Sequence, residues 1–174
     1  GYLGGVSLPF SYAEYHAVEQ ALKETNAKVQ FKAVWVGDFN DPAKARQAAD
    51  AMIADGVDFI MGSLNLGIVG LTESVKSSGG KTLITVKYTD KSATAPNNIV
   101  TSVLYDFTPP LKEMVTKIRN GERKGYYEMG MGKGISIQLP LKNAPPELSK
   151  EIAKIVEDIK SGQIKVAEDA TPVK

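Results

Sequence analysis

The sequence predicts an α/β fold, a mainly parallel sheet flanked by helices. Short β-rich runs alternate along the chain with stretches of helical spacing, which is typical of strand–helix–strand units. Glycine and proline stand where these stretches begin or end. The 174 residues are 43% hydrophobic and 24% charged, which is the composition of a folded chain with its own core.

Strands are predicted where short apolar runs are bounded by turn residues. They cover residues 2–6, 29–36, 58–61, 82–86 and 99–104. The run 29–36 alternates and then becomes fully apolar, as a strand entering a sheet interior does. The glycines of the first strand indicate that backbone there comes close to another group.

Helices are predicted where apolar residues recur at helical spacing. They lie around residues 17–22, after Asp41, over 67–77, near Pro109, and after Pro145 as far as Gly162. Asp41 followed by Pro42 is a start signal, because a carboxylate accepts free N–H bonds at the N-cap and proline presets the first helical residue. Gly56 suits the left-handed residue after the helix end.

A glycine-rich segment, Gly130 to Gly134, has apolar residues alternating on either side over 126–139. It resembles a phosphate-binding loop, but that motif needs a strand, a loop and a helix in order, with lysine followed by serine or threonine. Here Lys133 is followed by another glycine and then Ile135. The pattern therefore favours a hairpin.

Composition excludes several classes of function. The net charge is +1, too small to hold nucleic acid by a single-sign field. With 0 Cys and 1 His, a disulfide, a thiol nucleophile and a Cys/His zinc site are impossible. The carboxylates are scattered and form no catalytic constellation, so we expect no enzyme, no metal and no cofactor. Because the chain starts at Gly1 with no targeting segment, we expect it to be part of a longer precursor.

The residues just after each predicted strand are the candidate site, because ligands of open α/β sheets bind outside the carboxyl ends of the strands. Phe39 can either plug a helix–strand joint or present a face for stacking. Ser63 and Asn65 can bind a ligand or cap the next helix. His16 has no nucleophile to serve, so a structural or exposed role is favoured. The candidate segments are 4–5, 37–41, 62–67 and 87–90. Together they offer glycines, an aromatic ring, amide and hydroxyl groups and carboxylates, which suits a neutral, polar, partly flat ligand.

From Tyr2 to about Val166 the chain resembles the basic membrane protein family of ABC-transporter substrate-binding lipoproteins, many of which bind purine nucleosides. The motifs that carry the resemblance are Tyr2-Leu3-Gly4-Gly5, Trp35-Val36-Gly37-Asp38-Phe39-Asn40-Asp41-Pro42-Ala43-Lys44, Asp55-Gly56-Val57-Asp58, Thr89-Asp90-Lys91-Ser92 with Ala95-Pro96, Thr101-Ser102-Val103-Leu104-Tyr105-Asp106-Phe107, and Ser161-Gly162-Gln163-Ile164.

The resemblance implies two α/β lobes of the type I periplasmic-binding-protein kind, which close on a ligand between them. Residues 1–104 then correspond to the second, C-terminal lobe. Residues 105–174 correspond to the hinge return, a crossover helix, the hairpin and the terminal helix, and the first lobe is absent. The crossover helix, with Leu111 and Ile118, should expose an apolar face. The family also implies an extracytoplasmic protein, lipid-anchored in its full-length precursor.

The resemblance also assigns ligand-binding roles to residues at matching positions of this sequence. Phe39 matches the aromatic that stacks on the base, Gly4 and Gly5 match backbone near the ligand, and Ser63 to Gly67 match the cleft floor. Two residues depart from the family: Tyr88 stands where many members have Asp or Asn, and Tyr105 stands where they have Lys or Trp. A phenol cannot accept hydrogen bonds from two hydroxyl groups at once, as a carboxylate does. The full predicted ligand-binding set is Phe39, Gly4, Gly5, Ser63, Asn65, Tyr88, Asp90 and Tyr105.

The resulting hypothesis is a solute-binding component of an ABC importer that closes on a nucleoside-like molecule. Its expected partners are that ligand, an ABC permease, and the missing lobe or a second copy. A ligand-sensing domain of a regulator or receptor is an alternative on the same fold. An α/β enzyme acting on a nucleotide or sugar is a third hypothesis, and it lacks a catalytic motif.

Overall fold

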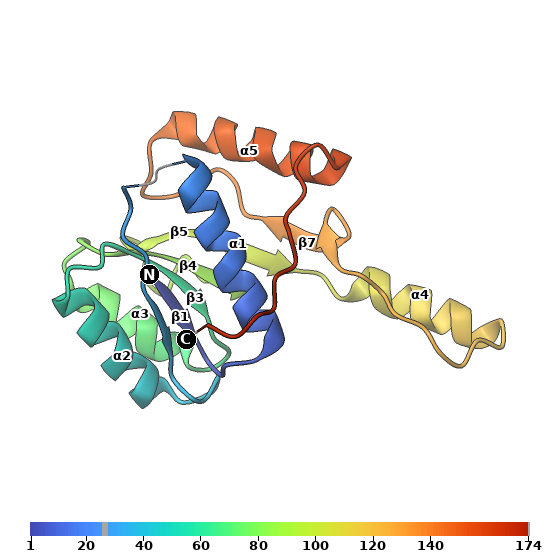
Figure 1. Ribbon diagram of the computed structural model, residues 1–174, viewed down its shortest axis with the longest axis horizontal. Coiled ribbons are helices and arrows are strands. Elements are labelled where there is room, and N and C mark those ends of the chain that lie inside the picture. The colour runs from blue at the N-terminus through green and yellow to red at the C-terminus, as the bar shows by residue number, and fades with distance from the viewer. Residues whose placement is uncertain (26–27, 174) are drawn as a thin grey trace.

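The computed structural model describes residues 1–25 and 28–173, which form one seven-stranded sheet flanked by helices (Figure 1). The strand order is β2-β1-β3-β4-β5-β7-β6, and the pairs linking β2 through β5 are parallel. The strands are β1 (Tyr2–Gly4), β2 (Ala33–Trp35), β3 (Phe59–Ser63), β4 (Leu83–Tyr88), β5 (Ile99–Tyr105), β6 (Gly130–Met131) and β7 (Gly134–Ile137). The helices are α1 (Pro9–Thr25), α2 (Pro42–Ala54), α3 (Ile68–Ser77), α4 (Thr108–Arg119) and α5 (Pro146–Ser161). The predicted fold class is confirmed.

The predicted ends of the helices are confirmed at α2 and α5. The Asp41 carboxylate accepts a hydrogen bond from the Lys44 N–H at 3.0 Å, and Pro42 is the first helical residue. Gly56, just beyond α2, has a φ of +88°, and Gly162 closes α5 with a φ of +77°. Glycine adopts this left-handed conformation without the strain that a Cβ would introduce.

Two predicted elements differ from the structure. The strand predicted over 29–36 is reduced to β2, because β2 is the edge strand and its partner β1 has only three residues to pair with it. The hairpin prediction is confirmed only at its turn, where Gly130 and Lys133 exchange two backbone hydrogen bonds of 2.8 and 3.2 Å. Residues 126–129 form no strand; β7 pairs antiparallel with β5 instead and extends the sheet.

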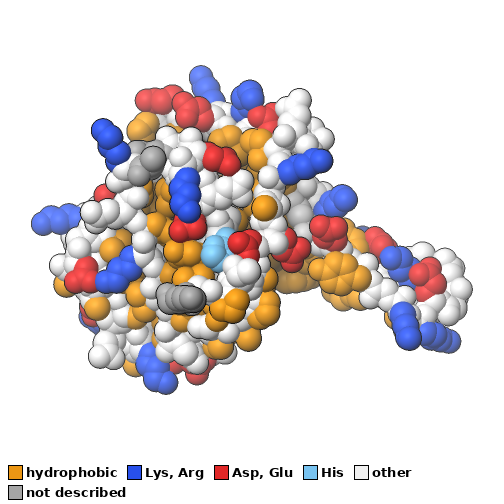
Figure 2. Space-filling model, viewed as in Figure 1, with side chains coloured by type: hydrophobic (Ala, Val, Ile, Leu, Met, Phe, Trp, Pro, Cys, Tyr) orange, Lys and Arg blue, Asp and Glu red, His pale blue; other side chains and the backbone are white. Residues whose placement is uncertain are grey.

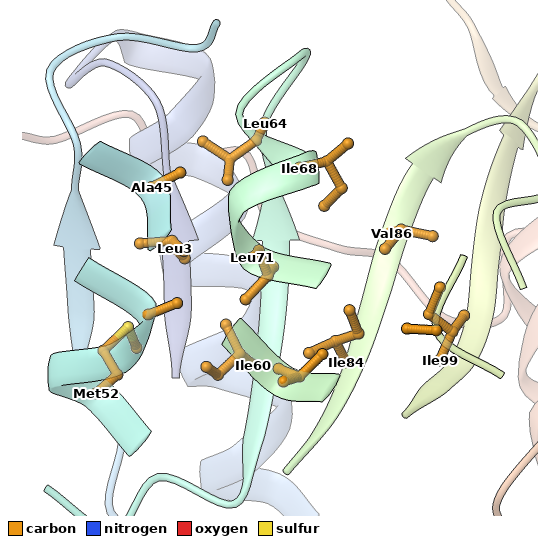
Figure 3. Packing of buried hydrophobic residues seen from close by; sticks show 13 residues of the cluster. Leu3, Ala45, Met52, Ile60, Leu64, Ile68, Leu71, Ile84, Val86 and Ile99 are labelled. Atoms are coloured by element: carbon orange, nitrogen blue, oxygen red, sulfur yellow. The ribbon is translucent and has the colours of Figure 1, made fainter. Parts of the chain in front are cut away.

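The main core lies between one face of the sheet and helices α2 and α3 (Figure 3). Leu3, Ile60 and Ile84 point from the strands toward Met52 of α2 and Leu71 of α3, and all five are almost completely buried. The two helices pack closely because Gly70 of α3 lies directly against the backbone of α2. This layer fixes where the strands end, and hence the loops that follow them.

Helix α1 covers the opposite face of the sheet. Trp35 lies next to Tyr12 and Tyr15 of this helix, with ring centroids 5.8 and 6.1 Å away. The C-terminal segment runs back beside α1, where the His16 Nε2 lies 3.0 Å from the Thr171 carbonyl oxygen (Figure 1). His16 therefore has a structural contact, as predicted.

Helix α4 projects from the body as an arm (Figure 1). Its apolar stripe, Leu111, Met114, Val115 and Ile118, is 45–56% exposed, and Figure 2 shows hydrophobic side chains along the arm among its charged ones. This confirms the exposed apolar face expected of this helix. No helix within the described ranges combines the length and apolarity that crossing a membrane requires.

Candidate ligand-binding site at the strand tips

The carboxyl ends of β1 through β5 meet at one edge of the sheet, because these strands run parallel. We call this edge the strand-tip shelf and define it by the ends of the strands and the loops that follow them. By this definition all eight predicted site residues lie on it: Gly4 and Gly5 at the end of β1, Phe39 after β2, Ser63 and Asn65 at the end of β3, Tyr88 and Asp90 at the end of β4, and Tyr105 at the end of β5.

Phe39 is half-buried, and its ring packs against Gly5 and Phe10 of its own chain. One side of its ring lies on Gly5, where an added Cβ would come within 2.1 Å of the Phe39 Cδ1. The ring also stacks on Phe10, with centroids 5.9 Å apart and planes 21° from parallel. The Phe39 carbonyl accepts hydrogen bonds from the N–H groups of Asn65, at 3.0 Å, and Gly67, at 2.9 Å. The loop after β3 is therefore held to the residue that carries the ring.

Gly4 and Gly5 are buried beneath rings of their own chain. An added Cβ on Gly4 would lie 3.0 Å from the Trp35 ring, and one on Gly5 would overlap Phe39. On the side where a side chain would stand, the rings of Trp35 and Phe39 already fill the space beside these glycines. Their lack of a side chain is what lets Trp35 and Phe39 sit on the sheet edge.

A buried polar cluster lies beneath the middle of the shelf, between α1 and the sheet. Lys87, whose side chain is 7% exposed, forms an ion pair with Glu14 of α1 and donates to the Ser63 Oγ at 3.0 Å. The other Glu14 carboxylate oxygen accepts from Ser63, at 2.7 Å, and from the Tyr2 hydroxyl, at 2.9 Å. Burial and the nearby Glu14 charge raise the pKa of Tyr2. A buried charge is tolerated when it is paired and hydrogen-bonded in this way.

Glu14 lies outside the candidate segments, and Lys87 falls within the segment 87–90 but not in the full predicted ligand-binding set. They lie 73 residues apart, so no spacing motif joins them. The sequence gives one indication of the pair, the charged Lys87 at the end of an apolar strand. That charge is equally consistent with the start of the polar stretch that follows. Their pairing becomes visible only when α1 is laid on the sheet.

An aromatic wall formed by Tyr88, Tyr105 and Phe107 stands at the β4–β5 end of the shelf. The two phenol rings are 5.0 Å apart, and Phe107 is 6.1 Å from Tyr105. Tyr88 has a φ of +79°, so its backbone leaves the strand conformation at this residue. Burial, and secondly the charge of Glu14, raises the pKa of Tyr105 to about 12, and the same causes raise the pKa of Tyr88.

Asp90 and Asn65 lie at the periphery of the shelf and are both exposed. The Asp90 carboxylate accepts from the Ser92 N–H at 2.8 Å and from the Gln138 amide, so it links the β4–β5 loop to the residue after β7. These hydrogen bonds, those from Ser92 first, lower the pKa of Asp90 to about 2.

Acid should remove the contribution of Asp90. A carboxyl with a lowered pKa stabilises the fold above its unfolded value of 3.8, and this stabilisation is lost as pH falls through about 2. We expect the urea midpoint of the protein to exceed that of Asp90→Asn above pH 3.8, and the difference to shrink as pH approaches 2. An unchanged difference across this window would show that the carboxylate charge is not involved.

The exposed groups of the strand-tip shelf differ in kind from the groups buried beneath it. Aromatic faces and hydroxyl groups are its exposed chemistry, and its buried carboxylate is engaged by Lys87, Ser63 and Tyr2. Across residues 1–25 and 28–173, no three His, Asp or Glu side chains gather as a metal ion would need. Stacking combined with a few hydrogen bonds is the pattern of a small-molecule binding site.

Comparison with known families decides what kind of protein carries this shelf. The family model described as "ABC transporter substrate-binding protein PnrA-like" matches residues 1–170. The chain belongs to this family.

Curated relatives agree with that assignment. Basic membrane protein A2 of Borrelia garinii is 31% identical over 169 residues, which are 94% of this chain and 50% of that protein. Basic membrane protein D of Borreliella burgdorferi is 28% identical over 97% of this chain and 51% of its own length. A purine-binding protein of Brucella abortus is 25% identical over 94% of this chain and 46% of its length. The chain therefore spans about half the length of the relatives it matches.

Solved structures support the fold. An ABC transporter solute-binding protein from Aeropyrum pernix aligns with a TM-score of 0.74 at 18% identity, covering 97% of this chain and 58% of that one. A transcriptional activator from Bacillus halodurans also aligns with a TM-score of 0.74, at 16% identity, covering 94% and 57%. This chain thus shares its fold with a solute-binding protein and with a transcriptional activator.

Proposed function

We propose that the chain is the C-terminal lobe of an extracytoplasmic substrate-binding component of an ABC importer. Its strand-tip shelf would form half of a site for a nucleoside-like small molecule, and an opposing lobe would supply the other half. In this proposal residues 1–104 form the binding lobe, and residues 105–174 return through the hinge. The proposed partners are the ligand and a membrane permease, and a lipid anchor would hold the full-length protein at the membrane.

One observation carries the proposal: the strand tips bear a half-buried ring, Phe39, at one end and an aromatic wall at the other. A planar ligand could stack on the ring of Phe39 or on the aromatic wall. The family match supports the transport role, and the name of the Brucella relative supports a purine-like ligand. The exposed stripe of α4 suits a helix that packs against an opposing lobe.

Closure of two lobes would be the mechanism. In the open form the shelf is wet and its contacts are weak. When an opposing lobe covers the ligand, stacking and hydrogen bonds become dry, so the ligand shifts the equilibrium toward the closed form that a permease recognises. Each lobe alone would bind poorly, since it offers only part of the contacts.

Replacing Phe39 tests the proposed site. In the product of the complete gene, Phe39→Ala should weaken binding of the best purine ligand by about tenfold or more, because base–aromatic stacking contributes about 1–3 kcal/mol. Isothermal titration calorimetry measures the loss. Phe59→Ala is the matched control, because Phe59 is also partly exposed but begins β3, at the opposite edge of the sheet. Equal affinities for the two variants would remove Phe39 from the site.

A sensory domain is the second candidate, favoured by the structural likeness to the transcriptional activator. The two functions require different gene contexts. A lipid-attachment signal and neighbouring permease genes would support transport, whereas a DNA-binding or signalling segment on the same polypeptide would support regulation.

A further inference from the structure

We propose that Lys87 is a positioning residue of the strand-tip shelf: paired with Glu14 of α1, it fixes the backbone of Tyr88 in the left-handed conformation that places this ring in the aromatic wall. The inference rests on the proposed function, since the aromatic wall is part of the proposed site. It gives helix α1 control over the shelf through Lys87, a buried side chain that a ligand need not touch.

The ring of Tyr88 joins the wall against the ordinary alternation of a strand, in which successive side chains face opposite sides of the sheet. Val86 of β4 lies in the core with α2 and α3, and Lys87 faces α1. Strict alternation would return the next side chain, that of Tyr88, to the core side. Tyr105 faces α1, because Val103, two residues before it, pairs in register with Lys87. The Tyr88 and Tyr105 rings nevertheless lie 5.0 Å apart, so the alternation is broken at Tyr88.

The backbone of Tyr88 makes this placement possible. Its φ of +79° lies in the left-handed region, which a residue with a Cβ adopts only at a cost in free energy. A conformation of this kind persists where the surrounding structure over-determines it. The Tyr88 side chain contributes little to that, because it is 38% exposed. The contacts that hold the conformation must therefore act on the residues on either side of it.

The residue before this position is held from two directions. The Lys87 ammonium forms the ion pair with Glu14 and donates to the Ser63 Oγ at 3.0 Å, which ties its side chain to α1 and β3. Its carbonyl oxygen accepts a hydrogen bond from the Lys91 Nζ at 2.7 Å, and the same Nζ donates to the Thr89 Oγ1 at 3.0 Å. Because both its side chain and its carbonyl group are bonded, Lys87 cannot rotate to relieve the strain at the next residue.

The loop after this position is held as well. The Asp90 carboxylate accepts from the Ser92 N–H at 2.8 Å and from the Gln138 amide, which ties the loop to the residue after β7. The backbone is therefore anchored on both sides of Tyr88. Asp90 is exposed, whereas the Lys87 ammonium is buried, where a hydrogen bond is electrostatically stronger than in water. We therefore assign the positioning role to Lys87.

Removing the ion pair without leaving a buried charge tests this role. In the product of the complete gene, Glu14→Leu combined with Lys87→Met removes the side-chain anchor and both charges, so the fold should persist, as urea denaturation would verify. A crystal structure of this double variant should show Tyr88 at negative φ, with its ring away from Tyr105. Calorimetry with adenosine, guanosine and inosine should show an affinity about tenfold lower, because only about a tenth of the molecules would then hold the left-handed conformation.

Glu19→Leu combined with Lys23→Met is the matched control, because it makes the same two changes in a surface pair of α1, 3.1 Å apart. It should leave the φ of Tyr88 and the affinity unchanged. Lys91→Met removes only the bond to the Lys87 carbonyl and should shift both quantities in the same direction by less, which supplies a test even if the double variant does not fold.

Two results would overturn the inference and leave the proposed function standing: a left-handed Tyr88 in the double variant, or an affinity equal to that of the unaltered protein. Failure of the proposed function has a different signature, namely that none of the three nucleosides binds the unaltered protein. The φ of Tyr88 in the double variant would still decide whether the Glu14–Lys87 pair positions this residue.

Discussion

Glu14→Leu should lower the free energy of unfolding by about 3 kcal/mol, although it adds an apolar side chain to a largely buried position. The reason is Lys87, which would remain buried with its ammonium paired only to the Ser63 hydroxyl. Removing one partner of a buried ion pair leaves an uncompensated charge, and this costs about 3–5 kcal/mol. Because the Glu14 side chain is 25% exposed, we expect the lower end of that range. Urea denaturation measures the change.

Two further variants separate the ion pair from general damage to α1. Glu19→Leu makes the same substitution on the same helix, but Glu19 pairs with Lys23 at the surface, 3.1 Å away, and should cost below about 1 kcal/mol. The double variant Glu14→Leu with Lys87→Met should recover most of the loss, because no charge then remains buried. If the double variant were less stable than Glu14→Leu alone, the ion pair would not be the cause.

The same variant should alter the aromatic wall. The Glu14 charge is the second cause, after burial, of the raised pKa of Tyr105. Without it, the pKa of Tyr105 should fall from about 12 toward its ordinary value of 10.0 while remaining above it. Ultraviolet titration of the tyrosines reports this shift, which a loss of stability alone would not produce.

The order of elements was predictable because each follows from local chemistry. The Asp41 cap and the apolar stripe of α4 are readable from a few adjacent residues, and both appear as expected. The length of β2 was not readable, since it depends on a three-residue partner strand brought in from elsewhere. The same holds for β7, whose partner is the open edge of β5 rather than the preceding segment.

The candidate site likewise has residues that the sequence could predict and residues that it could not. Phe39, Ser63 and Tyr88 were predictable because a parallel sheet brings its strand ends to one edge, whereas Tyr105 entered the predicted set through the family resemblance. The burial of Gly4 and Gly5 was not, because it depends on which way the rings of Trp35 and Phe39 turn. The Glu14–Lys87 pair joins a helix to a strand across 73 residues, and neither residue type signals a buried partner. Side-chain pairing between layers is what a single sequence leaves open.

Gly70→Ala should destabilise the protein by about 3 kcal/mol although it adds only one methyl group. Its Cβ would lie 1.9 Å from the Pro42 carbonyl oxygen and 2.8 Å from the Arg46 nitrogen. Both are backbone atoms of α2, so no side chain can move aside and the two helices must separate. Overpacking of this kind costs about 1–3 kcal/mol, and the rigid contact places Gly70 at the upper end. Urea denaturation again measures the change.

This substitution should also weaken ligand binding, which connects the core to the site. Helix α3 begins directly after Gly67, whose N–H bonds the Phe39 carbonyl, so moving α3 loosens the residue that carries the stacking ring. Gly125→Ala is the matched control, because its Cβ would meet nothing closer than 3.9 Å. It should leave stability and affinity unchanged. If Gly70→Ala lost stability but kept full affinity for the best ligand found in the calorimetric test, the close packing of α2 and α3 would not position Phe39.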